Sequence, residues 1–320
     1  MNERGKPYFS VVIPTCDRPE VLARTFALFG LGQQHSLGGE LLPEWEVIVT
    51  DDSANPAPQQ ALVARFANAR YVRGPRRGAG MNRNAGVAAA MGEWVVFLDD
   101  DCVVRPDFLA HLTRCIATTG ADIIEGRIVC PEKTGWPWRS EPENLTGGVF
   151  WSGNLAVRRA VFRALGGFDP ALGRGEDLYF AQLILAKRLR TAFCREAVAL
   201  HPSELLSPRR YAARILSSRW QLLVRLKMSP PRPGGAGWVT AMRAVLLCWL
   251  PVALRQSWIP LRDNWRQGRA PSVAVLCGSL LNLVYLPFLL PYMIFWERRY
   301  RQLFAQPAPH PGEKPSPVES

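Results

Sequence analysis

A five-residue apolar run, Trp94–Leu98, is followed at once by three carboxylates, Asp99, Asp100 and Asp101. A continuous apolar run of this length predicts a strand that is buried on both faces. Three adjacent carboxylates repel one another, and a bound divalent cation offsets that repulsion because such cations prefer oxygen ligands. The same acids also fit a solvated turn that caps a helix beginning near Pro106. The stretch alone therefore leaves both a metal site and a helix cap open.

Before this stretch, short apolar runs alternate with segments of helical periodicity. Val21, Leu22, Phe26 and Phe29 recur at helical spacing, and the Ala-rich segment 79–91 also favours a helix. Strands that alternate with helices predict an α/β fold, a doubly wound and mostly parallel sheet whose ligands bind beyond the carboxyl ends of its strands. The expected strands are residues 8–13, 46–50, 69–73 and 94–98, and the expected helices are 18–31, 58–67 and 79–91.

Acidic side chains recur in the loops that lie at this edge of the expected sheet. Asp51 and Asp52 follow the second strand, just as Asp99–Asp101 follow the fourth. A carboxylate can accept a hydrogen bond from a pyrimidine N3–H, and other carboxylates can hold ribose hydroxyls or a cation that bridges phosphates. The pattern therefore favours a nucleotide as the ligand. A helix cap near Pro56 is a second explanation for Asp51 and Asp52.

A basic, glycine-rich loop, residues 73–84, connects the third strand to the next helix. Backbone N–H groups at a helix N-terminus, together with basic side chains, suit a diphosphate. A flexible, solvated turn is the alternative. The loop lacks the Gly-Lys-Ser/Thr of a P-loop, which argues against an ordinary nucleoside triphosphatase.

The net charge of +12 lies in one segment of the chain. Residues 195–301 hold 16 Lys or Arg against 4 Asp or Glu, which leaves 23 basic and 23 acidic residues elsewhere. Because this segment also contains the longest apolar runs, the charge favours an anionic membrane surface and argues against nucleic acid as a partner. The seven cysteines form no Cys-x-x-Cys pair, and no apolar leader is evident, so we expect reduced thiols in a cytosol-facing protein.

Six short motifs follow one another over roughly residues 8 to 201. They are Val12-Ile13-Pro14-Thr15 with Arg18, Asp51-Asp52-Ser53, Arg83-Asn84-Ala85-Gly86, Phe97-Leu98-Asp99-Asp100-Asp101, Gly166-Gly167-Phe168-Asp169 and Gly175-Glu176-Asp177. Motifs in this order resemble those of the family 2 glycosyltransferases. The resemblance implies a GT-A fold, a nucleotide-diphosphate sugar as donor, a divalent metal (Mn²⁺ or Mg²⁺) and transfer with inversion.

The resemblance also implies roles for single residues. Asp99 faces the ribose or the metal, Asp101 coordinates the metal as the last acid of an Asp-x-Asp motif, and Asp100 fills the variable middle position, where sharing the metal stays open. His201 resembles a histidine that completes the metal or diphosphate site in some relatives, although a His-Pro pair at a strand end also fits a structural turn. The expected nucleotide-sugar ligands are Pro14, Thr15, Arg18, Asp51, Asp52, Arg83, Asn84, Asp99 and Asp100.

Residues 106–204 form the expected acceptor part. Trp151 is a candidate for stacking on an acceptor sugar, as are Trp136, Trp138 and Phe150, although a buried aromatic is the plainer explanation for each. Sugar transfer with inversion needs a base for the acceptor hydroxyl. By resemblance Asp177 is that base, and Glu176 orients or binds the acceptor. Acids in the first turn of a helix also need no function, because the helix dipole favours them.

The C-terminal part reads as a membrane-associated region. Val273–Trp296 contains no charged residue and is long enough for a transmembrane or inserted helix, although its prolines leave a re-entrant hairpin open. The expected domains are a catalytic domain 1–204 with a nucleotide-sugar part at about 8–105, a basic amphipathic helix 205–228, a linker 229–237, a membrane-associated region 238–301 around the helix 273–296, and a disordered tail 302–320.

Taken together, these features predict a membrane-associated inverting glycosyltransferase of hexosyltransferase type on the cytoplasmic face of the cell membrane. We expect a glycan or a lipid-linked acceptor and a role in cell-envelope or polysaccharide synthesis. A non-catalytic nucleotide-sugar-binding or membrane-docking module with the same fold is the alternative, and the presence of both the Asp-x-Asp and the Glu-Asp motif argues against it.

Overall fold

The structure is a computed structural model that describes residues 6–38, 41–134 and 139–207, together with the isolated positions 210, 224, 228, 291, 294 and 295. The chain divides into two compact units, Met1–Tyr211 and Ala212–Ser320. The helices and strands described below all belong to the first unit.

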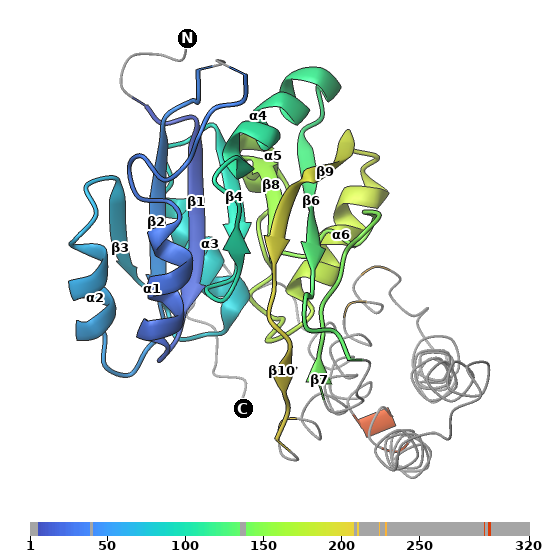
Figure 1. Ribbon diagram of the computed structural model, residues 1–320. Coiled ribbons are helices and arrows are strands. Elements are labelled where there is room, and N and C mark those ends of the chain that lie inside the picture. The colour runs from blue at the N-terminus through green and yellow to red at the C-terminus, as the bar shows by residue number, and fades with distance from the viewer. Residues whose placement is uncertain are drawn as a thin grey trace, which may run out of the picture. The chain divides into compact units, whose positions relative to one another are not determined.

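Eight of the described strands form one mixed sheet (Figure 1). Strands β3, β2, β1 and β4 run parallel, as the sequence predicts, whereas β8 runs antiparallel to both β4 and β6. The sheet order is β3 (Ala69–Arg73), β2 (Trp45–Asp51), β1 (Phe9–Thr15), β4 (Trp94–Leu98), β8 (Asn154–Arg158), β6 (Ile123–Val129), β9 (Thr191–Leu200) and β5 (Val103–Val104). A separate two-stranded sheet pairs β7 (Arg139–Ser140) with β10 (Glu204–Leu205).

Helices cover both faces of the large sheet, so its central strands are buried on both sides (Figure 1). One face packs against α1 (Pro19–Ala27), α2 (Ala57–Val63) and α4 (Phe108–Thr119), and the other packs against α3 (Ala79–Ala89), α5 (Arg159–Ala164) and α6 (Glu176–Ala186).

The side chains of strand β4 pack into both hydrophobic cores, one on each face of the sheet. Trp94, Val96 and Leu98 belong to the first core cluster, whereas Val95 and Phe97 belong to the second, and all five side chains are fully buried. Successive side chains of a strand point to opposite faces, so a strand between two helical layers must be apolar at every position. The prediction of a doubly wound α/β sheet is confirmed, and the predicted strand bounds 69–73 and 94–98 match those of β3 and β4.

Several elements differ in length from the prediction, and the helix expected at 58–67 spans Ala57–Val63. The helix expected at 18–31 ends at Ala27, because Leu28 and Phe29 donate backbone hydrogen bonds to residues three positions earlier and so tighten the last turn. Strand β9 is longer than the apolar residues at its end suggest, because it begins at Thr191 and its first four residues pair with residues 123–126 of β6. Arg195 and Glu196, in the middle of the strand, are exposed.

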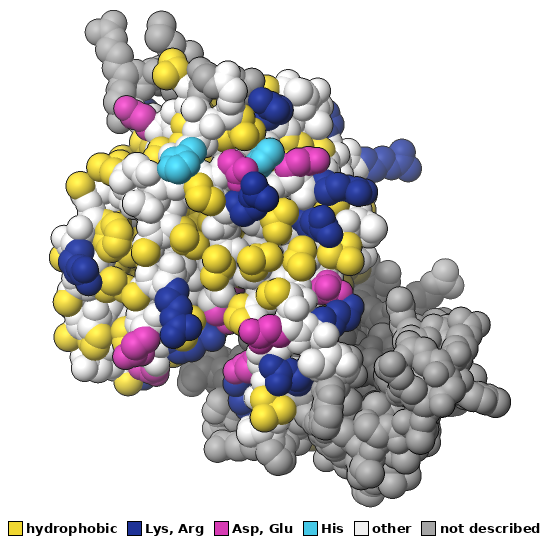
Figure 2. Space-filling view, viewed as in Figure 1, with side chains coloured by type: hydrophobic (Ala, Val, Ile, Leu, Met, Phe, Trp, Pro, Cys, Tyr) yellow, Lys and Arg dark blue, Asp and Glu magenta, His cyan; other side chains and the backbone are white. Residues whose placement is uncertain are grey.

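Charged side chains of both signs are interspersed over the face that carries α1 and α2 (Figure 2). This mixture agrees with the balanced charge of the chain outside residues 195–301. The predicted helix 205–228, linker 229–237, region 238–301 with the helix 273–296, and tail 302–320 lie outside the described residues except for a few positions, so these remain predictions. Within the described part of the chain, no helix has the length and apolar character to cross a membrane.

The aromatic cluster behind β4 gives a test of the fold. The ring of Phe97 lies 5.2 Å from that of Phe162 and 5.3 Å from that of Phe168, centroid to centroid. We expect Phe97→Ala to lower the free energy of unfolding by about 3–5 kcal/mol, because it leaves a cavity in a packed core. Urea denaturation followed by circular dichroism measures this loss. Leu31, which is 65% exposed, provides the control, and an equal loss in Leu31→Ala would contradict the assignment.

Candidate active site

The carboxyl ends of β2, β1 and β4 meet at one edge of the sheet, because these neighbouring strands run parallel. Thr15 at the end of β1 stands in register with Asp51 at the end of β2, and Asp99 follows β4 directly. The three loops that the sequence places at one edge are therefore brought together. Predicted site residues on these loops lie side by side although they are far apart in the chain, as Thr15 and Asp100, 85 positions apart, show by their hydrogen bond.

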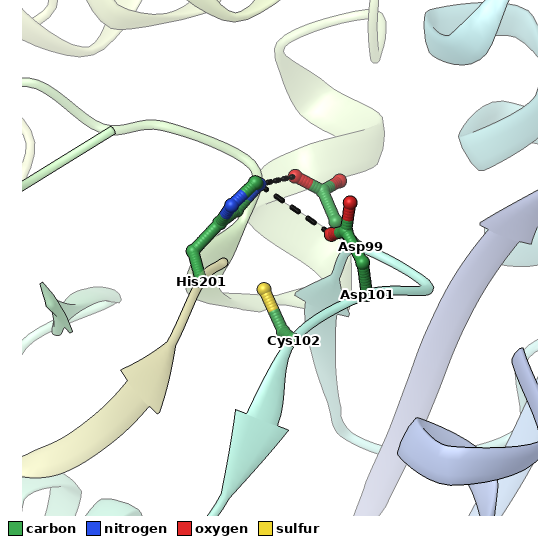
Figure 3. A group of neighbouring side chains, drawn as sticks. All are labelled: Asp99, Asp101, Cys102 and His201. Carbon is green, nitrogen blue, oxygen red and sulfur yellow. Dashed lines mark ion pairs between the residues drawn. The ribbon is translucent and has the colours of Figure 1, made fainter. Parts of the chain in front are cut away.

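Asp99 and Asp101 face the ring of His201, which follows β9 (Figure 3). Nε2 of His201 lies 3.4 Å from Oδ1 of Asp101 and 3.9 Å from Oδ2 of Asp99. Oδ1 of Asp101 is buried and has no hydrogen-bond partner, and burial raises the pKa of this carboxyl. The backbone N–H of His201 donates to the carbonyl oxygen of Val129, which holds the histidine at the rim of the sheet.

This group has the composition of a cation site. Ligand atoms of Asp99, Asp101, Cys102 and His201 all lie within 4.8 Å of one another. Burial raises the pKa of the Cys102 thiol well above its ordinary value, and the thiol donates to the carbonyl oxygen of Gly153. A thiol is a soft ligand, whereas hard cations such as Mn²⁺ and Mg²⁺ favour carboxylate oxygens. Two carboxylates and an imidazole remain, and with a buried, unpartnered oxygen among them they fit a divalent cation such as Mn²⁺ or Mg²⁺.

Asp100 points away from this group, although it stands between its two acids. Its side chain is 1% exposed, accepts a 2.7 Å hydrogen bond from the hydroxyl of Thr15 and pairs at 2.5 Å with Nη2 of Arg18. Its backbone carbonyl accepts a further bond from the hydroxyl of Thr25. Burial raises the pKa of the Asp100 carboxyl to about 6, against the opposing effect of Arg18. Asp100 thus ties the loop to β1 and α1.

The alternative in which the three aspartates cap a helix does not fit the structure. Helix α4 begins at Phe108, its N-cap residue is Asp107, and no side chain makes a capping hydrogen bond there. The carboxylates of the triplet instead form ion pairs with Arg18, Arg83 and His201.

Arg83 on α3 joins the triplet to the start of α6. Nη2 lies 2.6 Å from Oδ1 of Asp99, and Nη1 lies 3.0 Å from Oε1 of Glu176. The guanidinium is 6% exposed. Burial alone lowers its pKa, but Asp99, Glu176 and Asp177 offset this effect, and the pKa of Arg83 is raised. The buried guanidinium of Arg83 thus connects Asp99 with Glu176, which are 77 positions apart in the chain.

Glu176 and Asp177 open α6, where the helix dipole alone would accommodate them. The Glu176 carboxylate is nevertheless paired with Arg83, and Oδ1 of Asp177 accepts a hydrogen bond from the N–H of Leu178. Burial raises the pKa of both carboxyls. An aspartate with a raised pKa is a stronger base than an ordinary one, which suits the role predicted for Asp177.

Asp51 and Asp52 differ in their surroundings. Asp51 is fully buried, and its carboxylate accepts hydrogen bonds from the N–H of Ser53 at 2.8 Å and the hydroxyl of Tyr71 at 2.9 Å. Asp52 is half-buried and accepts a bond from the N–H of Arg76, and burial raises its pKa. Neither caps α2, whose N-cap makes no side-chain bond, so the predicted alternative of a helix cap does not fit. Asp52 is thus the acid more open to a ligand.

Among the described residues, Asn84, Pro14 and Trp151 form no hydrogen bond or ion pair with the acids of the triplet. Both ends of the Asn84 amide bond to the backbone of Phe168, which fastens α3 to the segment before α6. Pro14 lies in β1, and Trp151, which is 36% exposed, lies in the turn before β8. Trp136 and Trp138 lie outside the described residues. The predicted roles of all these residues in binding stay predictions.

Several residues at the site carry no sequence signal for it. Tyr71 lies in a strand, and Thr25 lies in the buried face of a helix, where each would be taken for an ordinary packing residue. Cys102 follows the triplet directly, and that adjacency is the one cue that could have included it in the group. The structural role of the middle acid, Asp100, likewise depends on partners that only the folded chain brings together.

The chain is similar to known proteins over the part that carries this site. Residues 10–167 match the family model described as glycosyl transferase family 2. Glycosyltransferase AglE of Haloferax volcanii is 21% identical over 215 residues, which cover 62% of this chain and 67% of that protein. The succinoglycan biosynthesis protein ExoO of Rhizobium meliloti is 43% identical over 82 residues, which cover 24% of this chain and 23% of that protein, well under two thirds of its length.

The fold is also similar to that of a solved structure, the mannosyltransferase PcManGT of Pyrobaculum calidifontis in complex with GDP-Man and Mn²⁺. The TM-score is 0.54 at 18% sequence identity, and the match covers 95% of this chain and 89% of that chain. At this level of identity the similarity shows a shared fold, and it confirms the predicted GT-A architecture.

The bridge made by Arg83 can be tested through stability. We expect Arg83→Met to lower the free energy of unfolding by about 3–5 kcal/mol, because it leaves two partly buried carboxylates without their cation. Arg158 is the matched control, since it also pairs with two acids, Glu93 and Asp122, but is 35% exposed and lies at the other end of β8. Arg158→Met should cost about 1 kcal/mol or less. If Arg83→Met lowers the free energy of unfolding no more than Arg158→Met does, the stabilising role of the Arg83 ion pairs is contradicted.

Proposed function

Since this chain belongs to the family 2 glycosyltransferases through residues 10–167, we propose that it transfers a sugar from a nucleotide-diphosphate sugar to a hydroxyl group of a glycan or lipid-linked acceptor, with inversion. The name of the relative ExoO places that protein in polysaccharide synthesis, which supports a role of this chain in polysaccharide or cell-envelope assembly.

One observation carries the proposal. The Arg83 guanidinium holds the Asp99 carboxylate and the Glu176 carboxylate at its two ends, so the acids of the Asp-x-Asp motif and the acids that open α6 share one site. A sugar transferase needs both sets within reach of one bond, because the departing diphosphate and the attacking hydroxyl lie on opposite sides of the anomeric carbon.

A divalent cation at this site would be held by Asp101, Asp99 and His201. When bound, such a cation neutralises the negative charge that develops on the departing nucleoside diphosphate. The unpartnered buried oxygen of Asp101 and the mixed carboxylate and imidazole donors support this assignment. That PcManGT was solved with Mn²⁺ supports manganese as the first cation to try. Asp100 lies outside the set, because its carboxylate is occupied by Thr15 and Arg18.

The donor's nucleobase would lie beside Asp52. This acid is half-buried, and the rigid Asp51 next to it is already satisfied by Ser53 and Tyr71. Asp51 would therefore shape the subsite, and Asp52 would accept the hydrogen bond from the base. PcManGT was solved with GDP-Man, which supports a guanosine donor in a first screen. A uridine donor belongs in the same screen, because a carboxylate can accept a hydrogen bond from a pyrimidine N3–H.

Asp177 would remove the proton of the acceptor hydroxyl. As the bond from the anomeric carbon to the diphosphate oxygen breaks, the acceptor oxygen forms its bond to that carbon from the other side, and its proton passes to the Asp177 carboxylate. The raised pKa of Asp177 suits this transfer, and Glu176 is fixed beside it by Arg83. Trp151 is exposed enough to contact the acceptor sugar.

We place the enzyme at the cytoplasmic face of the membrane. The support comes from the sequence alone, from the excess of basic residues in 195–301 and the uncharged run 273–296. The alternative, a non-catalytic nucleotide-sugar-binding module, predicts tight donor binding without turnover.

Replacing Asp177 tests the function. We expect Asp177→Asn to lower turnover by about 10²–10⁴-fold, because an amide cannot accept the hydroxyl proton. Release of nucleoside diphosphate from a panel of UDP- and GDP-sugars with Mn²⁺ and sugar acceptors measures turnover, and calorimetry measures donor binding, which should stay close to the wild-type value.

Asp169 is a suitable control for this experiment, because it precedes α6 in the same segment and the proposed chemistry does not use it. Asp169→Asn should retain turnover. Wild-type turnover in Asp177→Asn would overturn the assignment of the base, and donor binding by the wild-type chain without turnover on any acceptor would favour the non-catalytic alternative.

A further inference from the structure

Glu125 on β6 is a buried carboxylate outside the acids assigned so far. The residue is 3% exposed. Its Oε1 accepts a hydrogen bond from the N–H of Gly148 at 2.6 Å, and its Oε2 accepts bonds from Val149 at 3.0 Å and Phe150 at 2.7 Å. A fourth bond comes from Nδ2 of Asn144 at 3.2 Å. Bonds to an ionised acceptor are about twice as strong as neutral ones, so these four hold the carboxylate and the loop together.

The segment that Glu125 holds has a backbone shape that needs support. Gly147, Gly148 and Phe150 have φ values of 80°, 89° and 54°. The left-handed region is open to glycine but costs energy for a bulky aromatic residue such as Phe150. A carboxylate that accepts bonds from three consecutive N–H groups, those of residues 148–150, stabilises this unusual turn directly. The N–H groups of residues 148–150 are therefore all held by a single side chain from β6.

The loop leads straight to the candidate active site. Trp151 follows Phe150, and its carbonyl oxygen accepts a hydrogen bond from the N–H of Asn154, where β8 begins. Two residues after Trp151, a Cβ at Gly153 would lie 3.0 Å from Oδ2 of Asp99, so the backbone closely approaches that carboxylate. The position of Trp151 relative to Asp99 is thus set between two fixed points, the anchor at Glu125 and the start of β8.

We propose that Glu125 is a positioning residue for the acceptor side of the site. It holds the segment 144–150 in its left-handed turn and thereby sets the position of Trp151, two residues before the backbone at Gly153 approaches Asp99. That this segment lies on the acceptor side depends on the proposed function. That Glu125 anchors the segment depends only on its four hydrogen bonds. Sequence patterns do not point to Glu125, because three of its four partners are backbone N–H groups.

Glu125→Gln tests the anchor with almost no change of shape. One end of the glutamine amide carries N–H donors, which must face at least one of the backbone N–H groups of residues 148–150. We expect the amides of Gly148, Val149 and Phe150 to exchange with deuterium about tenfold faster than in the wild type, while the amides of β1 and β4 keep their protection.

The kinetic readout separates positioning from a general loss of structure. With the nucleotide sugar and the methyl glycoside that give the wild type its highest turnover, we expect the acceptor KM of Glu125→Gln to rise about tenfold and the donor KM to stay within about twofold. The matched control is Glu46→Gln. Glu46 is 6% exposed and accepts bonds from Ser10 and the N–H of Met91, but it lies at the opposite end of the sheet. Glu46→Gln should leave the acceptor KM and the exchange of the amides of residues 148–150 at their wild-type values.

Two results would overturn the proposal: wild-type exchange at residues 148–150 in Glu125→Gln, or a donor KM that rises as much as the acceptor KM. If Glu125→Gln does not fold, Asn144→Ala takes its place, because it removes the bond that Nδ2 of Asn144 donates to the carboxylate and the bond that the N–H of Gly147 donates to Oδ1 of Asn144. A wild-type chain without turnover on any donor would contradict the proposed function instead, and the exchange measurement would still decide the anchor.

Discussion

Two arginines compensate the negative charge that collects where β4 ends. Arg18 pairs with Asp100 and Asp101, and Arg83 pairs with Asp99 while it also holds Glu176. Without these cations, adjacent carboxylates at the end of a fully buried strand would repel one another in a medium of low dielectric constant. Because Arg18 precedes α1 and Arg83 belongs to α3, the two helices on opposite faces of the sheet are both fastened to the same loop.

This compensation also leaves room for a ligand. Asp100 and Arg18 satisfy each other, whereas Asp101 keeps a buried oxygen without a hydrogen-bond partner beside the His201 ring. The antiparallel β8 enters the sheet next to β4 and brings the turn with Trp151 to the same edge. The fold thus places donor-side acids, a potential cation site and acceptor-side residues around one point, although they come from distant parts of the chain.

The sequence predicted those features that depend on local pattern. The uniform apolar character of residues 94–98 identifies a central strand, and acids after two parallel strands indicate a shared edge. It left the role of Asp100 open, because hydrogen bonds of that residue come from Thr15 and Thr25, which lie more than seventy positions away. The sequence did not predict the role of Glu125 for a related reason, because three of its four hydrogen-bond partners are backbone N–H groups, which have no sequence signature. The site roles carried over from the family resemblance still await experiment.

The central claim is that the acids after β4 form the metal and donor site of a glycosyltransferase. Crystals of the protein grown with GDP or UDP and soaked in MnCl₂ would test it most directly, through anomalous difference density near the manganese absorption edge. We expect one strong peak within coordination distance of Asp101, with Asp99 or His201 beside it, and the diphosphate of the nucleotide in contact with the manganese ion. A manganese ion and diphosphate bound elsewhere, with Asp101 unliganded, would contradict it.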